Sequence, residues 1–368
     1  HQLSNEKTMS NDQPTEPESQ LPSKHVAIVG AGPIGIELAV ALKRAGIPFD
    51  VFDAGSIGHT ISWWAPQTRW FSSNERIAIA GVPLLTNDQS KATREQYLTY
   101  LRSVAMQFDL NIHSYCPVTR VEKVDGRFNL TTGPAGRRQS WAARAVVLAI
   151  GGTDFPKRLG IAGEDLPHVD GYLRETHRYF GRRVLIIGGR NSAIEAALRL
   201  HHAGAKVSLS YRGSSLPEDG IKYWLLPEIK GLLKAGRIGD FTGTIPIEIT
   251  PDRVRLQSVA DHSVSEVVAD NVLSLIGYEQ DKSLLHGAGV DLVDSMQRPA
   301  YDPHTMQTNI PGIYVAGTAI AGTQSSKYKT FLENCHDHVD KIVADLSGRP
   351  SDNTPREYSQ QITAQPES

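Results

Sequence analysis

A glycine-punctuated stretch near the N-terminus, residues 25–53, constrains the fold of this chain more than any other. It reads HVAIVGAGPIGIELAVALKRAGIPFDVFD. The apolar, β-branched run 25–29 predicts a strand, and residues 36–45 carry apolar side chains at helical spacing. A second short apolar run, 48–52, ends on Asp53. The order of strand, glycine turn, helix, strand and acid predicts a βαβ unit with parallel strands.

The glycines of this stretch follow the G-x-G-x-x-G spacing, and each has a different physical task. Gly30 makes the tight turn after the strand, Gly32 lets the backbone approach a pyrophosphate, and Gly35 lets the helix pack closely on the sheet. The helix N-terminus attracts an anion, and Asp53 can accept hydrogen bonds from a ribose hydroxyl. The stretch therefore predicts a dinucleotide site. Its residues are Gly30, Ala31, Gly32, Pro33, Ile34, Gly35, Asp53 and Ala54.

A second stretch, residues 182–212, repeats this pattern as RRVLIIGGRNSAIEAALRLHHAGAKVSLSYR. It predicts a strand at 184–187, a helix at 193–203 and a strand at 206–210. Two residues differ from the first unit: Arg190 replaces the middle glycine, and Arg212 replaces the acid. A guanidinium at that place suits a ribose 2′-phosphate and favours NADPH over NADH, unless Arg212 is only a solvated surface residue. The predicted site residues are Gly188, Gly189, Arg190, Asn191, Ser192, Ala193 and Arg212.

The rest of the chain supplies further elements of an α/β fold. Residues 92–108 predict a helix capped by Thr93, and the runs 110–115, 117–124, 127–131 and 139–142 predict a β-meander. Buried strands are expected at 144–150, 270–276 and 312–316, and shorter ones near 239–249 and 253–258. Residues 216–238 predict a helix interrupted at Pro227, and a last helix is expected to run to about residue 346, with Cys335 about seven residues inside it.

Composition excludes several classes of protein. The 368 residues carry a net charge of −2, with no block of Lys or Arg that would suggest nucleic acid or an anionic membrane as a partner. No apolar run approaches the roughly 20 residues of a membrane span. Cys116 and Cys335 form no C-x-x-C pair, which favours a reducing cytoplasm. No residue cluster suggests a metal site.

Two nucleotide units in one chain suit an enzyme in which a nicotinamide gives hydride to a bound flavin. We expect two Rossmann-like domains: an FAD domain formed by residues 23–155 and 280–347, and an inserted NADPH domain formed by 156–279. The polar segments 1–22 and 348–368 are expected to be disordered or loose. Further residues predicted to lie at the cofactors are Val118 near the adenine, Gly151, Gly277, and Gly317, Thr318, Gly322, Thr323 and Gln324 near the isoalloxazine.

The ordered body resembles the thioredoxin-reductase-like flavoproteins, and in particular the bacillithiol disulfide reductases. The resemblance rests on GAGPIG at 30–35, IAGEDLPHV at 161–169, ETHRYFGRRVLIIGGRNSAIEAAL at 175–198, IKYWLLPEIKGLLKAG at 221–236 and TNIPGIYVAGTAIAG at 308–322. It implies FAD and NADPH as cofactors and a small disulfide as acceptor. We also expect a cytoplasmic homodimer.

Two departures from this resemblance concern the chemistry. Members of the bacillithiol-type family resemble each other in a cysteine between Pro and Gly of the first fingerprint, where this chain has Ile34, and the usual Gly-Asp of the last flavin motif is Gly317-Thr318. Cys116 and Cys335 are interpreted as structural, and no protein acid–base pair is assigned. His336 and His338 are interpreted as surface or packing residues.

Several functions stay open at this point. The leading one is an FAD-dependent NADPH oxidoreductase whose acceptor is a low-molecular-weight disulfide. The alternatives are a ferredoxin-type NADP reductase, a flavin monooxygenase and a non-enzymatic flavin or NADPH sensor. The aromatic residues Trp63, Trp64, Trp70 and Phe71 could wall a planar ligand or belong to the core.

Overall fold

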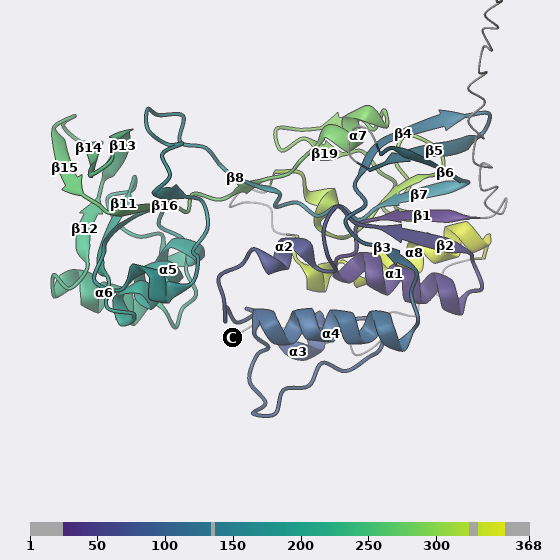
Figure 1. The fold of residues 1–368 in the computed structure, drawn as a ribbon, viewed down its shortest axis with the longest axis horizontal. Coiled ribbons are helices and arrows are strands. Elements are labelled where there is room, and N and C mark those ends of the chain that lie inside the picture. Colours follow the sequence, from purple (N-terminus) through teal and green to yellow (C-terminus); the bar gives the residue numbers. More distant parts are fainter. Residues whose placement is uncertain (1–24, 134–136, 324–329, 350–368) are drawn as a thin grey trace, which may run out of the picture.

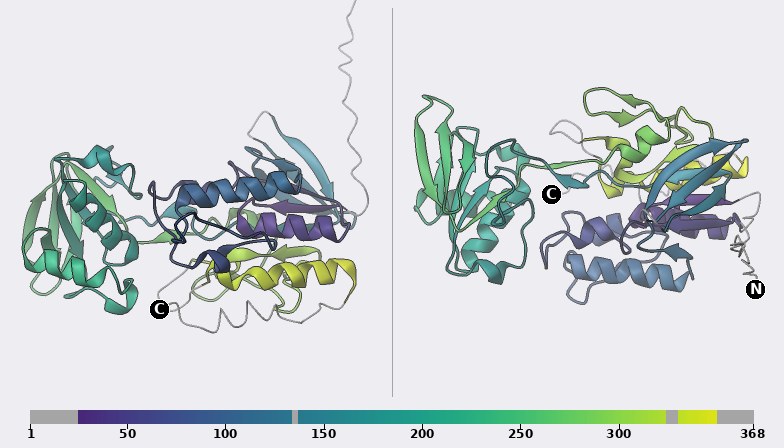
Figure 2. Two further views of the ribbon diagram at one scale, coloured as in Figure 1. Left: turned by 90° about the horizontal axis from the view of Figure 1, so that it is seen from below. Right: turned by 45° about the horizontal axis from the view of Figure 1, so that its top comes forward.

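The computed structural model describes residues 25–133, 137–323 and 330–349, and it shows two lobes joined by a narrow connection (Figures 1 and 2). The predicted segment 1–22, all but the first two residues of the predicted segment 348–368, and Gln324 lie outside the described residues. Each lobe contains its own parallel sheet and its own buried apolar cluster. We call the lobe that begins the chain the first lobe and the other the inserted lobe.

The first lobe is built on a five-stranded parallel sheet with the strand order β20-β7-β1-β2-β3. Its central strands are short and apolar, and all four residues of β1 and of β7 are buried, as expected where both faces of a sheet are covered. Figure 1 shows the meander above this sheet and helices below it. The bounds are β1 Val26–Val29, β2 Phe49–Phe52, β3 Ile112–His113, β7 Ala145–Leu148 and β20 Ile313–Val315; β4 Val118–Val124, β5 Arg127–Thr132 and β6 Gln139–Ala143; α1 Pro33–Arg44, α4 Arg94–Gln107 and α8 His336–Ser347.

Three sequence predictions for this lobe can be compared with the structure. The cap of α4 is confirmed: the Thr93 hydroxyl accepts the Gln96 N–H, and the Gln96 side chain accepts the Thr93 N–H. The placement of 110–115 in the meander is wrong, because β3 pairs parallel with β2 in the main sheet. The last helix begins at His336, so Cys335 is its N-cap residue and does not lie inside it.

The inserted lobe repeats the architecture with the strand order β12-β11-β10-β16-β9. Helices α5 and α6 cover one face, and the antiparallel sheet β13-β14-β15 covers the other (Figure 1). Pro227 occupies the first turn of α6, where proline is tolerated, so it begins that helix and does not interrupt it. The bounds are β9 Val169–Asp170, β10 Arg183–Ile187, β11 Lys206–Tyr211, β12 Gly239–Thr242 and β16 Asn271–Ser274; β13 Thr244–Ile249, β14 Arg253–Ser258 and β15 Val264–Val268; α5 Asn191–His202 and α6 Leu226–Lys234.

Short elements complete both lobes. They are α2 His59–Ser62, α3 Asn74–Ile77, α7 Ser283–Gly287, β18 Leu292–Val293, β19 Arg298–Pro299, and the 3-10 turns η1 Thr176–Tyr179, η2 Glu218–Gly220, η3 Gly317–Ala321 and η4 Leu332–Asn334.

The chain passes between the lobes through two antiparallel strands, β8 (Phe155–Pro156) and β17 (Tyr278–Glu279). Asp154 joins the two passages: its backbone N–H donates to the Glu279 carbonyl at 2.8 Å, and its carboxylate accepts the Asp281 N–H at 2.7 Å. Burial raises the pKa of Asp154 from 3.8 to about 6.

This raised pKa predicts that Asp154 makes the free energy of unfolding depend on pH. The folded protein holds a proton on Asp154 more tightly than the unfolded chain does, so this carboxyl loses stabilising effect as pH rises from about 4 to 6. Asp154→Asn keeps an acceptor for the Asp281 N–H and removes the ionisation. We expect the variant to gain unfolding free energy over the parent across that window, measured by urea denaturation at each pH. A difference that does not change with pH would contradict this assignment.

Candidate dinucleotide sites

The turn between β1 and α1 has the geometry expected of a phosphate-binding turn. Gly30 has φ +112°, and its N–H donates to the Phe52 carbonyl at 2.7 Å, which ties the turn to β2. A Cβ on Gly30 would lie 2.2 Å from the Ala149 carbonyl oxygen, and one on Gly35 would lie 1.9 Å from the Gly30 oxygen. A Cβ on Gly32 would meet no protein atom within 4 Å. Two glycines thus allow close packing, and the middle one faces open space, where a phosphate can approach.

Asp53 closes this turn from the end of β2. Its carboxylate accepts the Ala31 N–H at 2.6 Å and the Gly55 N–H at 2.8 Å. Its carbonyl accepts the Cys116 N–H at 2.8 Å, which brings the start of the meander, with Val118, to the same end of the sheet. Ala54 is exposed beside it. The structure therefore groups these predicted residues at the carboxyl end of β1 and β2.

A second group of predicted residues meets where β7 and β20 end. A Cβ on Gly152 would lie 2.9 Å from the Thr318 carbonyl oxygen, so the turns after the two strands touch. A Cβ on Gly317 would lie 3.3 Å from the Cβ of Ile34 on α1. The sheet thus brings Gly151, Ile34 and Gly317 together from three separate parts of the sequence.

Three residues that were not predicted as site residues hold this group in place. The Gln280 amide donates to the carbonyls of Gly151 and Ala319, both at 2.9 Å, and Lys282 donates to the Thr323 hydroxyl at 2.7 Å. His338 is buried, and its Nδ1 accepts the Gly317 N–H at 3.1 Å. Burial lowers the pKa of His338 to about 4, so it is a neutral acceptor at pH 7. His338, which was predicted to be a surface or packing residue, therefore helps to hold the Gly317 turn in place.

The turn between β10 and α5 reproduces the first turn, with two changes. The Gly188 N–H donates to the Ser210 carbonyl at 2.9 Å, and a Cβ on Gly188, whose φ is +141°, would lie 2.4 Å from the Leu275 oxygen. Ala193 is fully buried at the packing position that Gly35 holds in the first unit. Arg190 is the exposed N-cap of α5.

An exposed cationic side chain near this second turn is available to bind an anion. The Arg212 side chain is exposed just after β11 and has no hydrogen bond or ion pair with any residue described. The Asn191 side-chain oxygen accepts the Lys222 N–H at 2.7 Å, and Ser192 is exposed beside it. Gly189 lies under the Tyr211 ring, and a Cβ on Gly189 would lie 2.3 Å from the Cδ2 atom of that ring. Gly277, with φ +109°, follows β16 at the same end of the sheet.

Comparison with known proteins identifies the arrangement. Residues 27–317 match the family described as "Pyridine nucleotide-disulphide oxidoreductase". The chain belongs to this family. It is 32% identical over 323 residues to the bacilliredoxin reductase Bdr of Bacillus subtilis, covering 88% of this chain and 97% of that protein. The structure of the bacillithiol disulfide reductase Bdr (YpdA) from Bacillus cereus matches with a TM-score of 0.83 and 32% identity, over 88% of this chain and 99% of that one.

The fold is that of thioredoxin reductases. The crystal structure of T. acidophilum thioredoxin reductase matches with a TM-score of 0.68 at 20% identity, over 88% of this chain and 98% of that one. This member of the oxidoreductase family is a flavin-dependent enzyme that uses FAD and NADPH. The open space before Gly32 and Gly151 fits a dinucleotide pyrophosphate in the first lobe. The unpaired Arg212 guanidinium fits a second phosphate group in the inserted lobe.

The two cysteines of the oxidoreductase lie in different surroundings. Cys335 is fully buried and donates its S–H to the Phe331 carbonyl at 3.1 Å. Burial raises its pKa far above the ordinary value, which keeps it a thiol. Cys116 is half-buried, and its N–H donates to the Asp53 carbonyl. Among the described residues, no group of three His, Cys, Asp or Glu side chains is placed to hold a metal ion.

The four aromatic residues predicted as possible ligand walls divide into two pairs. Trp64 and Trp70 are core aromatics of the first lobe: their rings lie 4.7 Å apart, and Trp70 packs 4.5 Å from Tyr97. Trp63 and Phe71 reach across to the inserted lobe, where their rings contact Tyr172 and Trp224.

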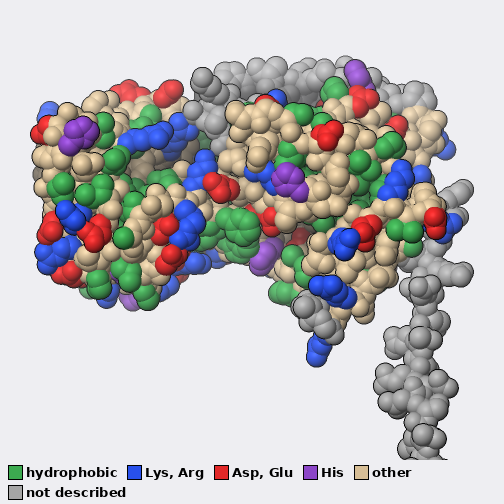
Figure 3. All heavy atoms as spheres, turned by 90° about the horizontal axis from the view of Figure 1, so that it is seen from above, with side chains coloured by type: hydrophobic (Ala, Val, Ile, Leu, Met, Phe, Trp, Pro, Cys, Tyr) green, Lys and Arg blue, Asp and Glu red, His purple; other side chains and the backbone are tan. Residues whose placement is uncertain are grey.

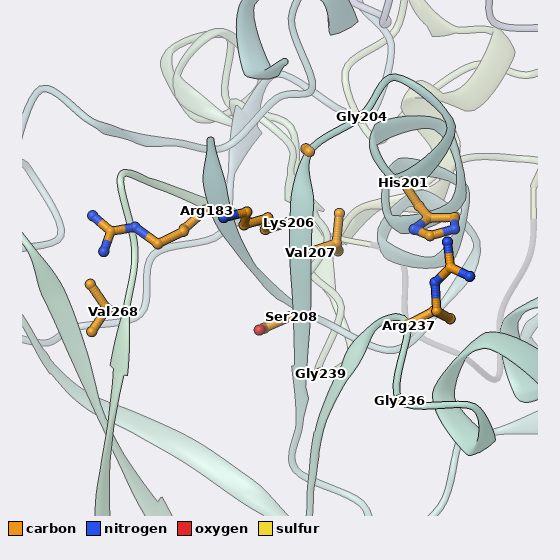
Figure 4. A pocket seen from close by; sticks show the side chains of 11 residues that line it. Arg183, His201, Gly204, Lys206, Val207, Ser208, Gly236, Arg237, Gly239 and Val268 are labelled. Carbon is orange, nitrogen blue, oxygen red and sulfur yellow. The ribbon is translucent and has the colours of Figure 1, made fainter. Parts of the chain in front are cut away.

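The surface adds two observations. On the face drawn in Figure 3, basic and acidic side chains are interspersed over both lobes. A pocket of about 440 Å³ lies at the amino ends of β10 and β11, where Figure 4 shows Lys206 beside Arg183, and His201 beside Arg237. This pocket is at the opposite edge of the sheet from Gly188 and Arg212 and contains none of the predicted residues. No helix in the described ranges is long and apolar enough to cross a bilayer.

Proposed function

We propose that this oxidoreductase transfers electrons from NADPH through FAD to a low-molecular-weight disulfide of the bacillithiol type. The observation that carries the proposal is the 32% identity to a bacilliredoxin reductase along 97% of that protein's length. Overall, NADPH, one proton and one disulfide become NADP⁺ and two thiols. FAD, when bound, would supply the redox chemistry that links the nicotinamide to the disulfide.

The protein's contribution is to bind and orient. We assign FAD to a domain formed by residues 23–155 and 280–347, with its phosphates at the α1 N-terminus and its adenosine near Asp53 and Val118. NADPH is assigned to residues 156–279, with its phosphates at Arg190 to Ala193. In this assignment His338 fixes the Gly317 N–H, and Gln280 fixes the Gly151 turn. No side chain of the chain serves as a general acid or base.

The acceptor can be tested by reoxidation. The holoenzyme is first reduced with one equivalent of NADPH without oxygen, and the loss of flavin absorbance is recorded. It is then mixed in a stopped-flow instrument with bacillithiol disulfide, glutathione disulfide, ferredoxin or air-saturated buffer. We expect bacillithiol disulfide to restore the absorbance at least tenfold faster than the others.

Each contrary result identifies an alternative. Fastest reoxidation by ferredoxin would replace the proposal with a ferredoxin-type reductase, and fastest reoxidation by oxygen would favour a monooxygenase. A flavin that NADPH does not reduce at all would indicate a sensor. Homodimer formation and a cytoplasmic location are also proposals, and sedimentation equilibrium of the full chain tests the first.

NADPH selectivity is predicted to depend on Arg212. Its unpaired guanidinium would form charge-assisted hydrogen bonds to the 2′-phosphate, which are typically worth about 1.5–3 kcal/mol. Arg212→Ala should therefore raise the KM for NADPH roughly tenfold or more and leave the KM for NADH nearly unchanged. Arg237→Ala, which removes an exposed arginine at the far end of the same sheet, is the matched control. Equal losses for both nucleotides would refute the assignment.

Turnover is predicted to need no cysteine. Ile34 lies against Gly317 at the place where the related reductases carry a thiol, and Cys335 is buried and protonated. We expect the double variant Cys116→Ser, Cys335→Ala to keep both flavin reduction and reoxidation within about threefold of the parent. Alanine is chosen at 335 because a hydroxyl there would be buried. A variant that NADPH still reduces, but that no longer passes electrons to a disulfide, would reveal a thiol relay.

A further inference from the structure

A set of contacts between the lobes converges on the segment 218–225, which lies over the second dinucleotide turn. The Phe71 ring of the first lobe stacks on the Trp224 ring of the inserted lobe, with centroids 5.6 Å apart and planes 18° apart. The ammonium of Lys91 lies 5.3 Å from the Phe71 centroid, and that of Lys222 lies 5.7 Å from it. Both ammoniums are also within 6 Å of the Trp224 centroid, at 5.4 Å and 5.7 Å.

The same segment touches the residues assigned to NADPH. The Lys222 N–H donates to the Asn191 side-chain oxygen at 2.7 Å, and its ammonium pairs with Glu195 of α5 at 3.4 Å. A Cβ on Gly220 would lie 3.5 Å from the Cγ of Arg190. One residue therefore separates Trp224, which makes the inter-lobe ring contact, from Lys222, whose N–H donates to Asn191.

Hydrogen bonds also fix the first-lobe segment that precedes Phe71. The chain between α2 and α3 reaches toward the inserted lobe (Figure 1). Arg94 on α4 donates to the carbonyls of Ser62 and Trp64 in this stretch, at 3.1 Å and 2.6 Å. Arg199 on α5 then reaches back across the junction, donating to the Pro66 carbonyl and to the Thr68 hydroxyl.

We propose that Phe71, Trp224 and Lys222 form a latch that positions the dinucleotide turn of the inserted lobe through Asn191. This inference rests on the assignment of NADPH to that turn. The latch stabilises the segment 218–225, so Asn191 is oriented before the nucleotide arrives and less ordering entropy is lost on binding. By linkage, a nucleotide that uses Asn191 also strengthens the ring contact between the lobes. Phe71 and Trp224 are thus positioning residues for NADPH although one of them belongs to the other lobe.

The decisive variant is Phe71→Ala, because Phe71 lies in the first lobe, outside the residues 156–279 that are assigned to NADPH. In FAD-loaded enzyme we expect the Kd for NADP⁺, measured by calorimetry, to rise three- to tenfold. Trp224→Ala should have the same effect, and the two losses should not add in the double variant, because both remove one contact. Trp224→Phe keeps a stacking ring and should restore most of the affinity.

Two controls and one spectroscopic signal complete the test. Met106→Ala removes an exposed apolar side chain from α4, and Leu85→Ala removes an exposed apolar side chain from the loop before α4; neither should change the Kd by more than about twofold. Trp224 fluorescence should change when NADP⁺ binds the parent and lose that change in Phe71→Ala. Parent-like affinity in Phe71→Ala, or additive losses in the double variant, would overturn the latch. A parent that does not bind NADP⁺ would instead overturn the cofactor assignment.

Discussion

Gly35→Ala is expected to destabilise the first lobe by several kcal/mol and to prevent it from holding FAD. A methyl group at this place would stand 1.9 Å from the Gly30 carbonyl oxygen, which is backbone of the turn and cannot rotate away. Relieving such overlap requires α1 to move from the sheet, and overpacking of this kind costs about 1–3 kcal/mol or more. The gain of up to about 1 kcal/mol from alanine in a helix does not offset this cost.

The matched control is Gly231→Ala. Gly231 lies within α6, and a Cβ there would meet no atom within 4 Å, so the substitution should leave the protein as stable or slightly more stable. Urea denaturation followed by circular dichroism measures both variants. An unchanged unfolding midpoint in Gly35→Ala would show that α1 does not pack on the turn as described.

Gly32→Val should differ from Gly35→Ala, because we expect it to give a protein that folds but does not bind FAD. Gly32 has φ −78° and ψ −177°, which a β-branched residue adopts readily, and no protein atom lies within 4 Å of its Cβ position. The valine side chain would occupy the space assigned to the pyrophosphate. We expect a colourless protein with parent-like unfolding, at least 100-fold weaker FAD binding, and unchanged NADP⁺ affinity in the inserted lobe.

The variants at Gly35 and Gly32 therefore distinguish a residue needed for folding from a residue needed for FAD binding. Purified parent protein should be yellow, and flavin released by denaturation measures the loss in each variant. A yellow Gly32→Val protein with the parent's flavin content would place the FAD phosphates elsewhere. Loss of folding in Gly32→Val would show that the open space before this glycine is needed by the protein itself.

Local patterns made the two βαβ units predictable. The spacing of Gly30, Gly32 and Gly35 encodes a turn whose hydrogen bonds and close contacts lie within a short stretch, and Gly188 and Ala193 repeat it. The structure gives each of these residues the packing position that the pattern predicts. The exposed Arg212 likewise follows β11 where its sequence position placed it.

Contacts between distant residues were not predictable in this way. β3 has the composition of a meander strand, and only its pairing with β2 assigns it to the main sheet. Gln280 reaches Gly151 across 129 residues, and His338 reaches Gly317 across 21, without any motif that joins them. The prediction of a helix interrupted at Pro227 was wrong because the apolar run before it resembles a helix, whereas α6 starts at Leu226 and has the proline in its first turn.

The position of β20 at the edge of the main sheet bears on how the chain is made. β7 ends at residue 148, and its edge partner β20 begins at residue 313, so about 165 residues separate the two strands. At roughly 5–20 residues per second, a ribosome needs about ten to thirty seconds to produce that interval. Every strand of the inserted lobe's parallel sheet emerges within it. The nascent inserted lobe can therefore finish folding while β7 still presents an unpaired apolar edge, with which a strand of another chain could pair.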